Sequence, residues 1–322
     1  MRRVFGVALT GLGAFLLVGA IMCRFYVPGQ VIKFPLNEYN VSTLTGTNVS
    51  YFSQQTGTVV NGATVRAIST VQGDVRAGSS STAVWNDVTG VFDVTSSPQV
   101  PVSYSTQRLA FDRRTGVLVN CCGAEVGTAR PHFAGQGYVW PIGTQQKTYE
   151  VFSIQTMKPE PFNYTGTATV DGLSAYVFVE PINNRQIGTV TVPGSLVGIK
   201  DQPTVKLPEY LTATNTYYVD PGTGSPVKVI QAQNETLQNP SDGTTALVLF
   251  NGTLTSTPQT IAAAVNTAKT ADDEISAVKD VGPLAGVLVS LLFLVAGILL
   301  LIGFYREEYE YEDDEETVGV QA

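Results

Sequence analysis

Two long apolar runs without a charged residue lie near the ends of this chain, and they constrain its architecture more than any other feature. The runs are Val4–Met22 and Leu284–Phe304, nineteen and twenty-one residues long. Helices of that length rise about 28–32 Å, which matches a hydrocarbon core of about 30 Å. The sequence therefore predicts two membrane-spanning helices with a long polar stretch between them.

The first run also has features of a cleaved or lipidated leader. Arg2 and Arg3 precede it, and Cys23 follows it. However, the run is long for a signal core and no small-x-small triplet closes it. Met22 also stands where a small residue usually precedes a lipidated cysteine. We expect a retained anchor over residues 1–24, with a cleaved or lipidated start as the alternative.

Basic residues beside the two runs indicate how the chain is oriented. Arg2 and Arg3 favour a cytoplasmic amino terminus, and Arg306 follows the second run. We expect a two-pass protein of the cell membrane with both termini cytoplasmic and an extracytoplasmic domain over residues 25–257. A stalk helix over 258–282 and a membrane helix over 283–305 should return the chain.

The last segment, residues 306–322, is strongly acidic. Eight aspartates and glutamates face a single arginine there, whereas the whole chain has a net charge of −8. Two interpretations stay open, a solvated and disordered tail that an anionic leaflet repels, and a docking segment for a basic cytoplasmic partner. The remaining polar stretch is nearly neutral and has no basic stripe, so we expect no nucleic-acid partner.

Residues 25–257 have the pattern of β structure. Valine, threonine and aromatic residues alternate in short stretches that glycine, proline, asparagine and aspartate interrupt. These stretches are Ser103–Phe111, Gly166–Val170, Ala175–Val179, Tyr217–Val219, Val227–Ile230 and Leu247–Leu249. The short run Thr64–Ile68 fits an edge hairpin. We predict a mainly β ectodomain of curved antiparallel sheets between two transmembrane helices.

An Asp-x-x-Thr-Gly motif occurs twice between strand-like segments. The first copy is Asp112, Thr115 and Gly116, and the second is Asp220, Thr223 and Gly224. The aspartate side chain caps a tight turn and the glycine supplies a positive φ, so both copies predict hairpin turns. The echo favours two related half-sheets, about 40–160 and 165–250, facing one another around an apolar cavity.

The segment before the second apolar run has the periodicity of a helix. Ile261, Val265 and Ala268 begin an apolar stripe at helical spacing, and Gly282-Pro283 should break or kink it. The helix either packs on the β domain or associates with copies of itself. Gly282 and Gly286 have the spacing of small residues at a helix–helix contact, with the first run as a candidate partner.

Motifs for catalysis or metal binding are lacking in the sequence. His132 is the only histidine, and there is no zinc-type cysteine pairing and no phosphate loop. Carboxylate pairs such as Asp112 with Asp220, or Asp171 with Glu180, are conceivable. We expect no enzyme, no cofactor and no metal. The adjacent Cys121 and Cys122 allow a vicinal disulfide, two free thiols or a disulfide between chains.

Several short motifs together resemble the actinobacterial family known as porin PorA, over the whole chain. They are Phe111–Gly116, Asn120–Gly123, Trp140–Thr144, Lys147–Tyr149 and Tyr218–Gly224. The resemblance implies a cell-envelope protein without assigned catalytic residues. Our leading hypothesis is a non-enzymatic membrane protein that binds or helps traffic lipid or glycolipid during envelope assembly. The alternatives are a scaffold or accessory subunit of an envelope-synthesis complex and an oligomeric channel.

Overall fold

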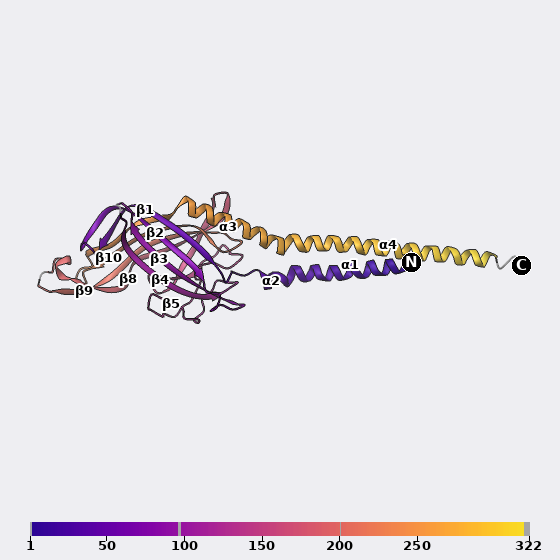
Figure 1. Ribbon diagram of the computed structural model, residues 1–322, viewed down its shortest axis with the longest axis horizontal. Coiled ribbons are helices and arrows are strands. Elements are labelled where there is room, and N and C mark those ends of the chain that lie inside the picture. Colours follow the sequence, from indigo (N-terminus) through magenta and orange to yellow (C-terminus); the bar gives the residue numbers. More distant parts are fainter. Residues whose placement is uncertain (1, 96–97, 200, 319–322) are drawn as a thin grey trace. The chain divides into compact units, whose positions relative to one another are not determined.

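The structure, a computed structural model, describes residues 2–95, 98–199 and 201–318. It divides into two compact units (Figure 1). One is a β domain over residues 33–271. The other is a helical unit made of residues 2–32 and 272–318.

The β domain is built on one antiparallel sheet of eleven strands. The first five are β1 (Tyr39–Ser53), β2 (Thr58–Gly73), β3 (Thr82–Asp93), β4 (Val100–Asp112) and β5 (Glu125–Val126). The other six are β6 (Tyr149–Ser153), β7 (Lys158–Val170), β8 (Leu173–Pro193), β9 (Thr204–Val219), β10 (Pro226–Gln238) and β11 (Thr245–Ser256). A short 3₁₀ turn, η1 (Gly194–Val197), precedes β9.

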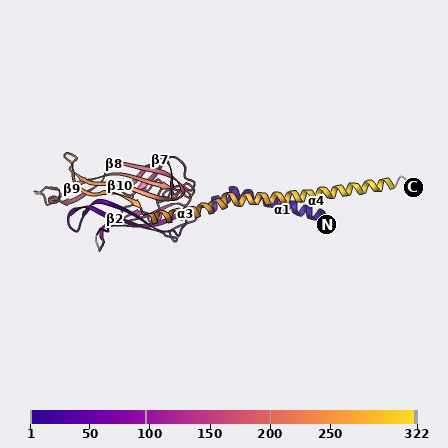
Figure 2. The ribbon, with the colours of Figure 1, turned by 90° about the horizontal axis from the view of Figure 1, so that it is seen from above.

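Two meanders meet in the middle of this sheet. The strand order is β5-β4-β3-β2-β1-β11-β10-β9-β8-β7-β6, so β1 and β11 join the amino-terminal and carboxyl-terminal strands. Figure 2 shows β7 to β10 in one layer and β2 in the facing layer, because the sheet curls back over itself. The expectation of a curved antiparallel sheet is confirmed. However, the strands form one continuous sheet where the sequence analysis expects two half-sheets.

Backbone hydrogen bonds partly connect the two edges of the sheet. Val119 donates to Ala110 in β4, and Leu118 donates to Gly135. The next residue, Gln136, donates to Glu150 in β6 at 2.7 Å. Two short backbone stretches, around Leu118 and Gln136, therefore lie between β4 and β6 and connect them by hydrogen bonds. Bridging of this kind leaves less of the sheet edge open to wrong pairing.

Alternating burial explains why these residues form strands. In β9 the residues Val205, Leu207, Leu211 and Ala213 are buried, whereas Lys206 and Thr212, which alternate with them, are exposed. One face of the strand therefore packs in the core. The segment Thr64–Ile68 lies inside β2, between β1 and β3, so the prediction of an edge hairpin there is wrong. Its polar residues face outward from a central strand.

Helix α3 (Pro258–Ser276) packs on the β domain. Thr257 caps its amino end, with the Thr257 hydroxyl accepting from the Thr260 N–H, and Pro258 occupies the first helical position. Val265 and Ala268 are buried against Val170, Ala175 and Val227. The Lys269 ammonium donates to the Asp171 carbonyl at 3.0 Å.

The helical unit contains two helices that are long and apolar enough to cross a membrane, among the residues that the structure describes. They are α1 (Arg2–Phe25) and α4 (Gly282–Val318), with the short α2 (Val27–Val31) after α1. Their exposed side chains include Phe15 at 74% and Leu292 at 71%. Such surfaces suit lipid rather than water.

The chain stays helical through Gly282-Pro283, where the sequence predicts a break or a kink. A π-helical turn, η2 (Ala277–Val281), precedes the proline, and the Gly282 N–H donates to the Ala277 carbonyl. This wider turn shifts the hydrogen-bond register just before the residue that lacks an N–H. The acidic tail continues as helix to Val318, where the sequence also allows a disordered tail, so that interpretation is wrong for residues 306–318. Residues 319–322 of the tail lie outside the described residues.

Small residues lie where α1 and α4 approach each other. A Cβ added to Gly13 would meet Leu294 and the Ser290 carbonyl, and one added to Gly297 would meet Thr10. Gly286 lies over Ala20, whereas the nearest atom to Gly282 is the Ala277 carbonyl of its own helical segment. Close backbone approach of this kind is typical of helix pairs in membranes.

Candidate functional site

The two Asp-x-x-Thr-Gly turns have the same internal geometry. Asp112 accepts hydrogen bonds from the Thr115 N–H at 2.8 Å and the Thr115 hydroxyl at 2.9 Å. Asp220 accepts the matching bonds from Thr223 at 2.7 and 2.6 Å. Gly116 and Gly224 have φ angles of +70° and +76°. Each turn reverses the chain after its strand, β4 in the first case and β9 in the second.

The segment 137–144 connects the two turns. Gly137 donates to the Gly116 carbonyl of the first turn, and Trp140 donates to the Gly224 carbonyl of the second at 2.8 Å. The Trp140 ring stacks on Phe178 with centroids 5.6 Å apart. Three of the motifs that sequence analysis singles out therefore meet in one place. Their role there is structural, because the carboxylate of each aspartate accepts hydrogen bonds within its own turn.

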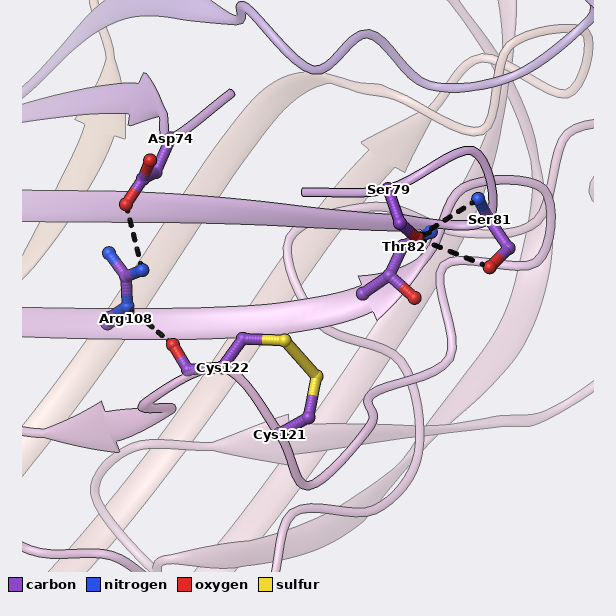
Figure 3. Close-up of a disulfide and its surroundings, with 7 residues drawn as sticks. All are labelled: Asp74, Ser79, Ser81, Thr82, Arg108, Cys121 and Cys122. Atoms are coloured by element: carbon purple, nitrogen blue, oxygen red, sulfur yellow. Dashed lines mark hydrogen bonds and ion pairs between the residues drawn. A yellow bond between two sulfur atoms is a disulfide. The ribbon is translucent and has the colours of Figure 1, made fainter. Parts of the chain in front are cut away.

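A vicinal disulfide lies beside β4, between Cys121 and Cys122 (Figure 3). Both residues are exposed, and Cys122 has a φ of +61°. The Arg108 side chain donates from Nε to the Cys122 carbonyl at 3.0 Å and forms an ion pair with Asp74 at 2.9 Å. That arginine lowers the pKa of the Asp74 carboxyl. It therefore holds the disulfide corner against the loop between β2 and β3.

A surface hollow of about 390 Å³ lies on the other side of Asp74. Gln72, Asp74, Arg76 and Asn86 supply most of its polar lining, with Gly73 and Val75. Asn86 also accepts from Arg108 at 2.9 Å. The hollow is wide open to solvent, so it does not enclose an acyl chain.

The buried face of the β domain carries an unusual number of carboxylates. Glu160, Glu180, Asp87 and Asp93 are all less than 9% exposed. Glu160 forms an ion pair with Arg185, and Glu160 also accepts from the Thr156 hydroxyl at 2.8 Å. Buried carboxylates are expensive unless they are paired or hydrogen-bonded. This acidic face, defined by Glu160, Glu180, Glu209 and Glu235 on β7 to β10, is the candidate functional site.

Glu180 is the most deeply buried member of the acidic face. Its side chain is 1% exposed, and Asn215 on the paired strand β9 donates to its Oε2 at 2.6 Å. Burial raises the pKa of Glu180 and the neighbouring Glu160 carboxylate adds to this, while Asn215 and Arg185 oppose it. Its Oε1 atom and the Oδ1 atom of Asn215 have no hydrogen-bond partner in the described part of the chain.

Glu235 and Glu209 form a second carboxyl pair on β10 and β9. Burial, followed by the hydrogen bond and negative charge of Glu209, raises the pKa of Glu235 to about 8. Two carboxyl groups this close cannot both be ionised cheaply, so they share a proton. A Cβ at Gly188 on β8 would lie 2.9 Å from Glu209 Oε2, which shows how closely the glycine approaches.

Tyrosines extend this polar interior towards β3. Burial raises the pKa of Tyr217 to about 12, and the charges of Glu180 and Asp87 act in the same direction. Asp87 accepts from Ser69 at 2.6 Å and from Gln107 at 2.9 Å. Acids on both layers of the curled sheet therefore act on the same phenol.

The carboxylate pairs considered from sequence do not form this site. Asp112 and Asp220 each bind their own threonine, and Asp171 lies in the turn before β8, nine positions from Glu180. His132 is exposed. Among the described residues no group of three or more histidines, cysteines or acids is placed to hold a metal ion. The partner of Glu180 is Asn215, which sequence analysis missed.

Comparison with known proteins identifies one family. The family model described as Porin PorA matches residues 5–299, which include the whole β domain and most of both apolar runs. No curated protein sequence matches the chain.

Proposed function

The chain belongs to the porin PorA family, and we propose that it is a cell-envelope channel protein whose β domain supplies an acidic, cation-attracting compartment. The observation that carries this proposal is the acidic face, where Glu160, Glu180 and Glu235 point into the domain and Arg185 is the basic partner. An interior of one charge sign, with walls of low dielectric, concentrates small ions of the opposite sign.

The acidic face reaches solvent at one point at least. Arg185 lies opposite Leu211, whose side chain is buried, yet 44% of the Arg185 side chain is exposed. A β-bulge between Ile182 and Arg185 lets β8 depart from regular pairing there. We propose this bulge as the place where ions enter the acidic face.

The outer face of the sheet indicates where a bilayer lies. A barrel that crosses lipid needs an outward apolar band. Here the outward residues of β7 and β9 include the exposed threonines Thr167, Thr169, Thr212 and Thr214. Large exposed apolar side chains on the described strands are Tyr39, Val41, Val88 and Tyr104. We therefore propose that α1 and α4 enter the membrane and that the β domain stands outside it.

Conduction across the membrane then requires several copies of the chain. Two helices cannot enclose a pore, so the proposed channel is a homo-oligomer whose helices surround the path and whose β domains gather cations at its entrance. The lipid and glycolipid hypothesis gains no support from the family match, which favours the channel alternative. The scaffold hypothesis depends on the acidic tail and stays open.

Planar bilayer recordings of the purified full-length protein test this proposal. We expect discrete conductance steps and, in a salt gradient, a reversal potential that favours cations. The double substitution Glu160→Gln and Glu209→Gln should reduce the cation preference, whereas Glu150→Gln, an exposed acid on β6, should leave it unchanged. A preparation that stays monomeric and electrically silent would contradict the proposal.

A further inference from the structure

Two neighbouring buried oxygen atoms accept no hydrogen bond from the residues that the structure describes. They are Oε1 of Glu180 and Oδ1 of Asn215, in side chains that are 1% and 4% exposed. The other end of each side chain is used, because Asn215 Nδ2 donates to Glu180 Oε2 at 2.6 Å. The two orphan acceptors therefore belong to one pair on directly opposed positions of β8 and β9.

Tyr217 offers a third oxygen atom on the same face, and the arginine that acts on Glu180 is already paired with another acid. Tyr217 lies two residues beyond Asn215 on the same face of β9, and its phenol forms a hydrogen bond with the Gln231 side chain. The basic group that acts on Glu180 is Arg185, and its guanidinium is paired with Glu160. Glu160 and Arg185 balance each other, so one negative charge on Glu180 remains uncompensated.

Buried acceptors of this kind need a proton donor or a cation. We propose that Glu180, Asn215 and Tyr217 form a binding site for one alkali-metal cation, Na⁺ or K⁺. A carboxylate, an amide carbonyl and a phenol oxygen are the hard oxygen ligands that such ions prefer. One positive charge also matches the one uncompensated negative charge. A divalent ion would leave an excess positive charge buried, at a large cost in solvation.

This site differs from sites for divalent and transition metals. It uses a single carboxylate and no cluster of histidines, cysteines or acids. Its residues lie thirty-five positions apart in the sequence and meet only through the β8–β9 register. The inference rests on the proposed function only in sharing the acidic face, and it requires no conduction.

Thermal unfolding of the full-length protein in detergent tests the site. Na⁺ or K⁺ chloride is raised from 1 to 100 mM at pH 8, with N-methylglucamine chloride holding the ionic strength constant. Because a ligand that binds only the folded state stabilises it by mass action, Tm should rise on the order of 5 °C with one of the two ions. N-methylglucamine is too large for the buried site and serves as the reference cation.

Two variants separate this site from general salt effects. Glu180→Gln keeps the shape of the side chain and removes the charge, so the dependence on cation identity should be lost. Glu209→Gln, on the same face, should keep it. Line broadening of the ²³Na resonance by the wild-type protein, relieved by K⁺ or by Glu180→Gln, gives a readout that does not need a melting curve.

Acid should compete with the cation, because the pKa of Glu180 is raised by burial and by Glu160, with Arg185 and Asn215 opposing. The cation effect should therefore shrink as pH falls from 8 to 5. Identical Tm values in all three cations, or a response that persists in Glu180→Gln, would overturn the site and show that a proton or water satisfies the pair. If bilayer recordings show no conductance while Tm still depends on the cation, only the proposed channel function is rejected.

Discussion

The backbone N–H of Trp140 donates to the carbonyl oxygen of Gly224 at 2.8 Å. This bond attaches the segment between β4 and β6 to the turn between β9 and β10, which are far apart in the sheet order. The close approach depends on glycine. A Cβ at residue 224 would collide with the carbonyl oxygens of Trp140 and Pro141, and the φ angle of +76° also disfavours any side chain.

Replacement of Gly224 by alanine should therefore destabilise the β domain by roughly 3 kcal/mol or more, from strain and collision together. Gly143→Ala is the matched control, because Gly143 has a φ of +79° but nothing within 4 Å of an added Cβ. Gly143→Ala should lower the free energy of unfolding by only about 1 kcal/mol. Urea unfolding followed by tryptophan fluorescence measures both. Equal losses would show that the contact with Trp140 contributes nothing.

The pair Glu235 and Glu209 should make stability depend on pH. The folded state raises the pKa of Glu235 to about 8, so between about pH 4.5 and pH 8 the folded chain binds more protons than the unfolded chain. Stability then falls as pH rises through this range. At pH 9, Glu235→Gln should be more stable than wild type by about 1–2 kcal/mol after allowance for solvent screening.

Urea unfolding at pH 5 and at pH 9 measures this effect. At pH 5 wild type and Glu235→Gln should have nearly equal stability, since both side chains are neutral there. Glu150→Gln, which removes an exposed acid on β6, should change stability little at either pH. If Glu235→Gln follows the wild-type pH dependence instead, the two carboxyl groups do not share a proton.

Helix packing predicts a specific cross-link within the helical unit. An ideal Cβ on Gly286 lies 3.0 Å from the Ala20 Cβ, so a small separation of the helices would bring the two positions to the roughly 3.5–4.5 Å of a disulfide. In a Cys23→Ser background, Ala20→Cys with Gly286→Cys should oxidise rapidly within one chain. Gly19→Cys with Gly286→Cys should not, because nothing lies within 4 Å of a Cβ at Gly19. Mass spectrometry of the cleaved protein distinguishes the two outcomes.

Local features of this fold can be read from the sequence. Each Asp-x-x-Thr-Gly turn is closed by hydrogen bonds between residues three apart, so its signature is contained in a few positions. The apolar runs likewise need only length and composition to indicate helices for a membrane. Alternating apolar and polar residues identify strands in the same way. The alternation does not show whether a strand lies at the edge or the centre of the sheet, as the segment Thr64–Ile68 illustrates.

Features that depend on strand register could not be predicted. Glu180 lies two residues from Phe178 and from Ile182, so it shares their face of β8. Asn215 shares a face of β9 with Ala213 and Tyr217 in the same way. This spacing could have identified both polar residues as inward-facing. Their pairing still requires the β8–β9 register, and a slip of one residue would turn every side chain to the other face. The continuous sheet is missed for the same reason, since β1 and β11 are distant in sequence.

The disulfide between Cys121 and Cys122 predicts a distinct alkylation pattern. Cys23 is an exposed free thiol, so it serves as an internal positive control. Protein unfolded in denaturant without reductant should take up one alkyl group, and prior reduction should add two more. Denaturant removes differences in access, so only covalent bonding then protects a thiol. Intact mass before and after reduction gives both counts directly.

Loss of the disulfide should have local consequences. Arg108 binds the Cys122 carbonyl and Asp74 together, and β5 pairs with β4 at Gln107 and Arg108. Cys121→Ser with Cys122→Ser should therefore speed amide exchange in β5 and in the loop after Gly73, with little change at the Trp140 segment. Three alkyl groups before reduction would show that the bridge is absent. In that case the double serine variant should exchange like wild type.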